Sequence, residues 1–304
     1  MKHTGKVTLI LLAMFFVTQL IGIFVIHQYT PQISEITDAD GNVVNITSYN
    51  LPYGMEPPQD INPGVTLISI AIAIAIAVSI MLILMKYNAE VLLRIWFFVV
   101  VAIALAITLN SFALKIPNAP IIALAIAIPI AFFKIFKNNV ILHNLTELAI
   151  YPGIAAIFVP LLNIWAIVIL LILISLYDMY AVWHAGFMQK MAKYQMQKVK
   201  VFAGFFVPYM SKKQRAILKK SKKKKVKNVK VAVAILGGGD VVFPIILAGV
   251  VLNTLGLAQA LFIPIGATLA LAGLFYLSKK GKFYPAMPFI TAGCFIALGL
   301  AYLL

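Results

Sequence analysis

The sequence predicts an all-α polytopic membrane protein with nine transmembrane helices, a cytoplasmic N-terminus and an extracellular C-terminus. Three observations predict this class. Hydrophobic residues make up 62% of the chain and charged residues 11%, and the mean hydropathy is +1.00, which excludes an ordinary soluble domain. The apolar residues form runs whose length is close to what a helix needs to span a bilayer, about 20 residues. The basic residues gather in every second connection between these runs.

The apolar runs follow one another along the whole chain. They cover approximately residues 7–26, 63–85, 95–114, 116–133, 140–159, 161–180, 229–252, 257–277 and 283–304. The first run has no small-residue cleavage site after it, so we interpret it as a retained helix and not as a signal peptide. The second run alternates with period two (SIAIAIAIAVSI), as strands do. A lone strand in lipid would leave its backbone unpaired, so the length of this run favours a helix.

The distribution of Lys and Arg predicts the topology. The N-terminal segment and the connections after the second, fourth, sixth and eighth runs hold 24 of the 25 Lys and Arg, and only Lys115 lies on the other side. The positive-inside rule places the basic connections in the cytoplasm. The net charge of +16 therefore follows membrane topology, and we expect no nucleic-acid partner.

The largest basic connection divides the chain. We expect an N-terminal helical part at residues 1–183, a basic cytoplasmic loop at 184–228 and a C-terminal helical part at 229–304. The segment from Lys190 to Lys230 holds 15 Lys and Arg and is expected to attract anionic lipid headgroups. An apolar patch in the loop, residues 202–209, is too short to span and is expected to dip into the membrane interface.

Three acidic residues lie inside apolar runs, namely Glu147, Asp178 and Asp240. A charge at the centre of a bilayer costs roughly 2.5–3.5 kcal/mol on insertion scales, so such residues commonly serve a function. Glu147 lies early in its run and is expected at the membrane interface, with His143 four residues earlier as its partner. The alternative is that Glu147 lines a cavity.

Asp178 and Asp240 are predicted to lie at matching depth. Asp178 precedes Lys190 by 12 residues and Asp240 follows Lys230 by 10 residues. Helical intervals would place the carboxylates roughly 18 Å and 15 Å from the first cytoplasmic ammonium groups. Two carboxylates in one site share a proton, so one can take a proton from water while the other donates to a carbonyl. A buried acid paired with a basic residue is the structural alternative, but neither run contains a basic partner.

Three short motifs occur in order on the sixth, seventh and ninth runs. They are Tyr177-Asp178, Gly237-Gly238-Gly239-Asp240 and Pro285-Ala286-Met287. This pattern resembles the YD, GxGD and PAL motifs of the presenilin and signal-peptide-peptidase family of intramembrane aspartyl proteases, especially archaeal presenilin homologues. The resemblance implies that Asp178 and Asp240 are the catalytic pair and that the PAL-like segment shapes the site beside them. Met287 stands where the motif has Leu, and the two side chains have similar volumes.

Each residue around the aspartates has two interpretations. Gly237–Gly239 either loosen a helix and expose backbone for strand-like pairing with a substrate, or allow close packing of helices. Pro285 and Pro288 either leave irregular backbone that lines a cavity, or mark an ordinary helix start. Tyr177 either hydrogen-bonds near the aspartates or is an interfacial aromatic residue.

The predicted function is an intramembrane aspartyl endopeptidase of the cell membrane that cleaves transmembrane helices of membrane proteins or signal peptides. A helical peptide bond is hydrogen-bonded internally, so the substrate is expected to unwind before attack. The alternatives are a carboxylate-gated proton-coupled transporter or ion-leak channel, and a scaffold whose aspartates are dispensable. No inverted repeat is evident, which disfavours a standard transporter. No cofactor or metal is expected, and the oligomeric state stays open, a homo-oligomer included.

Overall fold

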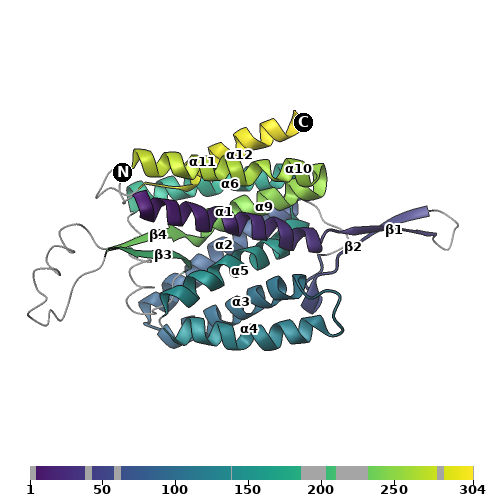
Figure 1. The fold of residues 1–304 in the computed structure, drawn as a ribbon, viewed down its shortest axis with the longest axis horizontal. Coiled ribbons are helices and arrows are strands. Elements are labelled where there is room, and N and C mark those ends of the chain that lie inside the picture. Colours follow the sequence, from purple (N-terminus) through teal and green to yellow (C-terminus); the bar gives the residue numbers. More distant parts are fainter. Residues whose placement is uncertain are drawn as a thin grey trace, which may run out of the picture.

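The computed structural model describes residues 5–37, 43–57, 63–137, 139–185, 203–209, 232–278 and 284–303. The helices form one bundle, and two hairpins of strands lie near its opposite ends (Figure 1). The helices are α1 (Gly5–Gln28), α2 (Pro63–Lys86), α3 (Glu90–Ser111), α4 (Ala119–Phe136), α5 (Val140–Phe158), α6 (Ile164–Tyr180), α9 (Gly238–Leu255), α10 (Leu257–Ala260), α11 (Phe262–Leu277) and α12 (Met287–Tyr302). The strands are β1 (Gln32–Thr37), β2 (Val43–Ser48), β3 (Gly204–Tyr209) and β4 (Ala232–Gly237).

The predicted class, a helical polytopic membrane protein, is confirmed. Within the described residues, eight helical segments are long and apolar enough to cross a membrane by length and composition, and α10 and α11 together form one of them. The apolar helix α12 is shorter, with 16 residues. The count of nine spans and the sidedness of the termini stay predictions.

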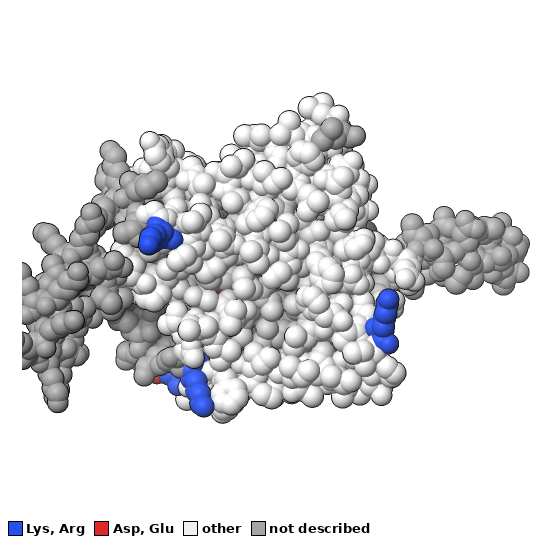
Figure 2. All heavy atoms as spheres, in the orientation of Figure 1, with Lys and Arg blue, Asp and Glu red and all other residues white. Residues whose placement is uncertain are grey.

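The surface has the charge pattern of a membrane protein. On the face drawn in Figure 2, the described Lys and Arg residues lie at the two ends of the bundle, and the broad area between them carries no charge. In the view of Figure 1, α1 begins at one end of the bundle and α12 finishes at the opposite end. An apolar band bounded by charged ends matches the hydrocarbon core of a bilayer.

The seventh apolar run is only partly helical, so the prediction of one helix over 229–252 is wrong at its start. Residues 232–237 form strand β4, and α9 begins at Gly238. The strand pairs antiparallel with β3, from Gly204 opposite Gly237 to Tyr209 opposite Ala232. A strand advances about 3.3 Å per residue instead of 1.5 Å, so the helical depth calculation for Asp240 does not hold.

The apolar patch at 202–209 also differs from its prediction. Residues 204–209 form β3, and the side chains of Phe205 and Val207 are buried inside the protein instead of in the membrane interface. Alternate residues of a strand point to opposite faces, and these two share the buried face. The apolar character of the patch therefore reflects packing against the bundle.

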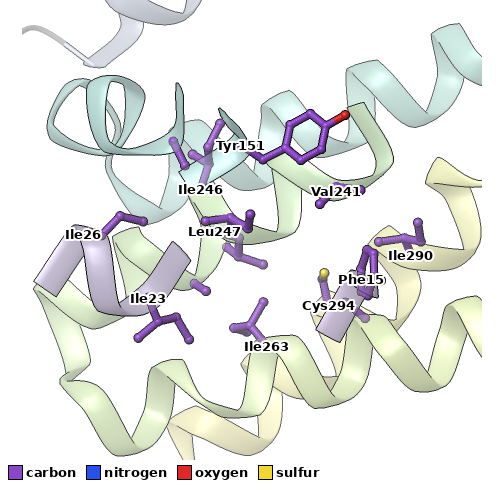
Figure 3. Close-up of a cluster of buried hydrophobic side chains, with 14 of the residues drawn as sticks. Phe15, Ile23, Ile26, Tyr151, Val241, Ile246, Leu247, Ile263, Ile290 and Cys294 are labelled. Atoms are coloured by element: carbon purple, nitrogen blue, oxygen red, sulfur yellow. The ribbon is translucent and has the colours of Figure 1, made fainter. Parts of the chain in front are cut away.

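Helix α9 lies at the centre of the larger hydrophobic core and contacts α1, α5, α6, α11 and α12. Phe15 of α1, Ile263 of α11 and Ile290 of α12 are fully buried in this core, and Figure 3 shows them near α9. Helices α11 and α12 approach closely at Gly266 and Gly293, where a side chain on either would meet the other helix's backbone. Both helices of this close pair also contact α9.

A polar network joins α1 to α3 at the end of the bundle that holds the β1–β2 hairpin. The Tyr29 hydroxyl donates to the carbonyl of Ile107 at 2.7 Å and accepts from Asn110 Nδ2 at 2.9 Å. Burial raises the pKa of Tyr29 to about 12, because the phenolate would lose its hydration. The neutral hydroxyl is therefore the stable form in this network.

Candidate active site

Asp178 lies in the last turn of α6, and its side chain is buried. Its Oδ2 accepts a hydrogen bond from the backbone N–H of Met287 at 3.1 Å, and the backbone amide of Ala286 lies beside it. Met287 is the first residue of α12, where the N–H groups have no partner within the helix. The Asp178 carboxylate of α6 therefore accepts a hydrogen bond from an N–H at the start of α12 that has no partner within that helix.

A second contact joins the same two helices one turn away. Ser175 Oγ and Thr291 Oγ1 are 2.8 Å apart, and both residues are buried. Ser175 precedes Asp178 by three residues and Thr291 follows Met287 by four, so the two contacts lie along one helix–helix seam. Together they fix the PAL-like segment against Asp178.

Asp240 lies in the first turn of α9, three residues after the N-cap residue Gly237. A Cβ at Gly237 would lie 3.2 Å from Asp240 Oδ2, so the carboxylate turns back over the N-cap residue, whose N–H it can accept. This is one half of a capping box, in which an acidic N3 side chain reaches the N-cap N–H. The helix dipole favours negative charge at this position.

The structure brings the two aspartates together. Helices α6 and α9 contact each other, and the carboxylates of Asp178 and Asp240 are within electrostatic reach. One comes from the end of α6 and the other from the start of α9, so the antiparallel helices present both at the same level. Their catalytic role stays a prediction.

Gly238 is the middle glycine of the Gly237-Gly238-Gly239-Asp240 motif, and its lack of a side chain has a steric reason. A Cβ there would lie 2.7–3.0 Å from Oη, Cε1 and Cζ of Tyr151. Figure 3 shows the Tyr151 ring beside the first turn of α9, near Val241. At Gly239, by contrast, the nearest atom would be Cε2 of Phe243 at 3.8 Å, an ordinary contact. Close packing therefore explains Gly238 but not Gly239.

The other motif residues differ in burial. Pro285 and Met287 are buried and Ala286 is half-buried. The residues from 284 to 286 are not helical, as the prolines predicted, and α12 begins only at Met287. Tyr177 is 44% exposed, which favours the interfacial interpretation.

The comparisons with known proteins agree with this geometry. The sequence model of the family described as signal-peptide peptidase, presenilin aspartyl protease matches residues 42–304. The chain belongs to this family. Membership indicates a presenilin-type intramembrane aspartyl protease, a multi-pass protein that meets membrane-protein substrates in a bilayer. No curated protein matches the chain in sequence.

Solved structures support the fold of the family. One crystal structure of a presenilin family intramembrane aspartate protease, in space group C222, has a TM-score of 0.61 at 17% identity and covers 97% of this chain and 98% of that chain. A structure with the same description in space group P2 has a TM-score of 0.59 at 17% identity, covering 96% of each chain. At this identity the likeness establishes the fold alone.

Two residues near the family motifs were not predicted. Gln19 of α1 is fully buried and its Nε2 donates to the carbonyl of Val241 at 2.9 Å, next to Asp240. Tyr151 of α5 packs on Gly238, and its buried hydroxyl has no hydrogen-bond partner among the described residues. A glutamine inside an apolar run is a signal that sequence analysis could have used. The position of Tyr151 could not be found without the tertiary structure.

Glu147 is not interfacial, so that prediction is wrong. Its side chain is 2% exposed, and its Oε1 pairs with Lys134 Nζ of α4 at 2.5 Å. The predicted partner His143 is present, with Nε2 3.6 Å from the same oxygen, which is too long for a hydrogen bond. Lys134 and Glu147 neutralise each other, so both can lie buried.

Proposed function

We propose that the chain is an intramembrane aspartyl endopeptidase that cleaves transmembrane helices of membrane proteins or signal peptides, with Asp178 and Asp240 as its catalytic residues. One observation supports this most strongly. Two acidic side chains from different apolar helices lie within electrostatic reach, and Asp178 accepts the free N–H of Met287. Placing two acidic groups within a bilayer costs free energy, so such residues commonly serve a function.

The two carboxylates can perform hydrolysis by sharing one proton. The ionised carboxylate takes a proton from water, whose oxygen attacks the carbonyl carbon, while the protonated carboxyl donates its proton to the carbonyl oxygen. The protonated carboxyl then donates its proton to the leaving nitrogen while the other carboxylate takes a proton from one hydroxyl of the gem-diol, so the C–N bond breaks and a carboxylic acid and an amine are released. The carboxylates then hold one proton again, and one water has been consumed for each peptide bond broken.

Strand β4 supplies a place for an unwound substrate. Phe206 lies opposite Ile235 in the hairpin, and its backbone groups face away from β4 toward α5. Phe206 and Ile235 therefore form a non-hydrogen-bonded pair, and the backbone groups of Ile235 face the other edge of β4. No described residue outside the hairpin hydrogen-bonds to the backbone of Ile235 or Val233. A substrate strand can add there, five residues before Asp240.

The proposal includes the membrane arrangement. Nine spans with a cytoplasmic N-terminus would place the ends of α6 and α9 that hold the aspartates toward the cytoplasm, as the basic connections require. The protein then resides in the cell membrane, and the basic loop meets anionic lipid headgroups. The Lys and Arg between 190 and 230 lie outside the described residues.

The test is a cleavage assay with purified protein in detergent and a single-span substrate. It compares the chain with Asp178→Asn and Asp240→Asn across pH, with circular dichroism as the control for folding. We expect cleavage to fall at least about 10³-fold in both variants, because each removes a proton-transferring group. The parent should also lose activity at acidic pH, where both carboxyls are protonated. Full cleavage by Asp240→Asn would refute the proposal.

Absence of cleavage by all three folded proteins would also refute it. Proton flux in liposomes that depends on the aspartates would then support the carboxylate-gated transporter or channel.

A further inference from the structure

The edge of β3 that faces away from β4 is closed by side chains of α5. Asn144 Nδ2 donates to the carbonyl of Phe206 at 2.7 Å, and the N–H of Phe206 donates to Asn144 Oδ1 at 2.9 Å. This amide makes the same donor–acceptor pair that a neighbouring strand would make. His143 Nε2 lies 2.7 Å from the carbonyl of Gly204, two residues earlier on the same edge.

Little of this edge remains open. Alternate residues of a strand direct their backbone groups to the same edge, so Gly204, Phe206 and Pro208 share the side that faces α5. Asn144 satisfies both groups of Phe206, and His143 satisfies the carbonyl of Gly204. Pro208 has no N–H to offer. A further strand therefore finds no free N–H at positions 206 and 208.

One of the two closing side chains, His143, is held by the buried ion pair of Lys134 and Glu147. A carbonyl only accepts, so His143 Nε2 carries the proton that Gly204 receives, and Nδ1 is then free to accept from Lys134 Nζ at 3.2 Å. Lys134 also binds Glu147, which lies one turn beyond His143 on α5. The ion pair thus fixes the imidazole ring as well as the contact between α4 and α5.

The same face of α5 reaches the GxGD-like motif. Tyr151 lies two turns beyond His143, on the side of α5 that faces the hairpin, and its ring packs on Gly238 and in a T-shaped contact on Phe205. The N–H of Gly238 donates to the carbonyl of Ala203 at 3.2 Å, which ties the start of α9 to the start of β3. One helix therefore positions both the hairpin and the turn that leads into Asp240.

We propose that Asn144 and His143 are positioning residues for the reaction, an inference that rests on the proposed proteolysis. They close β3 and fix the hairpin on α5, which leaves β4 as the edge where a substrate strand adds. Because a strand that pairs in one register presents one peptide bond to Asp240, these residues set where the substrate is cut. They touch neither substrate nor reacting atoms.

The first experiment compares Asn144→Leu with Thr108→Val, using a single-span substrate and mass spectrometry of the products. Leu has a shape similar to Asn but makes no side-chain hydrogen bonds, so the two bonds between Asn144 and the backbone of Phe206 are lost. We expect kcat to fall about tenfold and the products to spread over additional cleavage positions. Thr108 donates to the carbonyl of Ala149 of α5 at 2.6 Å, away from the hairpin. Thr108→Val should cleave at the parental positions. Asn144→Gln keeps the amide and should cleave more often at the parental positions than Asn144→Leu does.

The second experiment does not depend on activity. Hydrogen–deuterium exchange measures the amides of residues 203–209 and 232–240 in both variants. We expect these amides to exchange about five- to tenfold faster in Asn144→Leu, in keeping with the loss of two net hydrogen bonds, and at the parental rate in Thr108→Val.

Parental exchange in the Asn144→Leu hairpin would overturn the inference, and so would parental cleavage positions in an active enzyme. A parent chain that cleaves nothing would instead refute the proposed function. The exchange measurement alone would then show whether Asn144 holds the hairpin in place.

Discussion

The two hairpins of this protein have equal strand lengths but opposite surroundings. Each consists of two antiparallel strands of six residues. The β1–β2 hairpin extends away from the helices, whereas β3–β4 lies against the bundle (Figure 1). Strand β3 contacts α1, α5 and α9, and its outer edge is bonded to Asn144 and His143. An isolated two-stranded hairpin is marginally stable in water, so these contacts decide which hairpin can hold a precise position.

This difference shows which hairpin is held in a fixed position by the helices. The β4 strand leads directly into Gly238 and Asp240, so any movement of the hairpin would move a carboxylate. The β1–β2 hairpin connects α1 to the segment before α2 and does not lead directly into an acidic residue of the candidate site. The predictions below remove the support of β3–β4, block its free edge, or crowd its junction with α9.

The largest expected effect follows from breaking the buried ion pair beneath the β3–β4 hairpin. Lys134→Met leaves Glu147 buried without its partner, so we expect a loss of about 3–5 kcal/mol of stability. Thermal unfolding in detergent measures it. The double variant Lys134→Met/Glu147→Gln removes both charges and should regain most of the loss. Equal unfolding temperatures for parent and single variant would show that the pair does not support the hairpin.

An intermediate effect is expected from a proline on the free edge of β4. Ile235→Pro removes the N–H that faces away from β3 and spares the ladder within the hairpin, so substrate pairing should weaken. We expect kcat/KM to fall about 10- to 100-fold in the single-span cleavage assay.

The comparison variant is Ile46→Pro in β2, a strand that does not lead directly into a catalytic candidate. It should leave kcat/KM within about twofold of the parent. Equal losses in the two prolines would contradict the assignment of substrate binding to β4.

The smallest effect compares two neighbouring glycines at the junction of β4 and α9. Gly238→Ala forces a methyl group onto the rigid Tyr151 ring, and overpacking of this kind costs about 1–3 kcal/mol. We expect a lower unfolding temperature and about tenfold lower activity. Gly239→Ala meets only Phe243 at ordinary distance and should behave like the parent. Replacement of Tyr151 by Leu should partly restore the stability of Gly238→Ala. Steric crowding would be excluded as the reason for this glycine if the two alanine variants were equally stable and the Tyr151 replacement had no effect on Gly238→Ala.

The motifs and the acidic candidates could be found in the sequence because they are local signals, and their catalytic role stays a prediction. A carboxylate inside an apolar run is conspicuous, and Asp178 and Asp240 lie in runs whose helices the structure places in contact. The start of α12 was also predictable, since Pro285 and Pro288 limit helix formation in that segment. Glu147 was misplaced because its partner Lys134 belongs to another helix, and only tertiary packing could reveal that the charge is neutralised in the core.

Two stretches with the same alternating pattern show what the sequence alone determined. SIAIAIAIAVSI lies in helix α2, as predicted from the need of a lone segment in lipid to satisfy its own backbone. The alternating VAVAIL before the glycines forms most of strand β4, because β3, on the other side of the long basic segment, pairs with it. The sequence by itself determined the membrane class, the apolar runs and the motifs, all of which depend on composition and local order. Only the tertiary structure decided which alternating run became a strand, because its hydrogen-bond partners are distant in sequence.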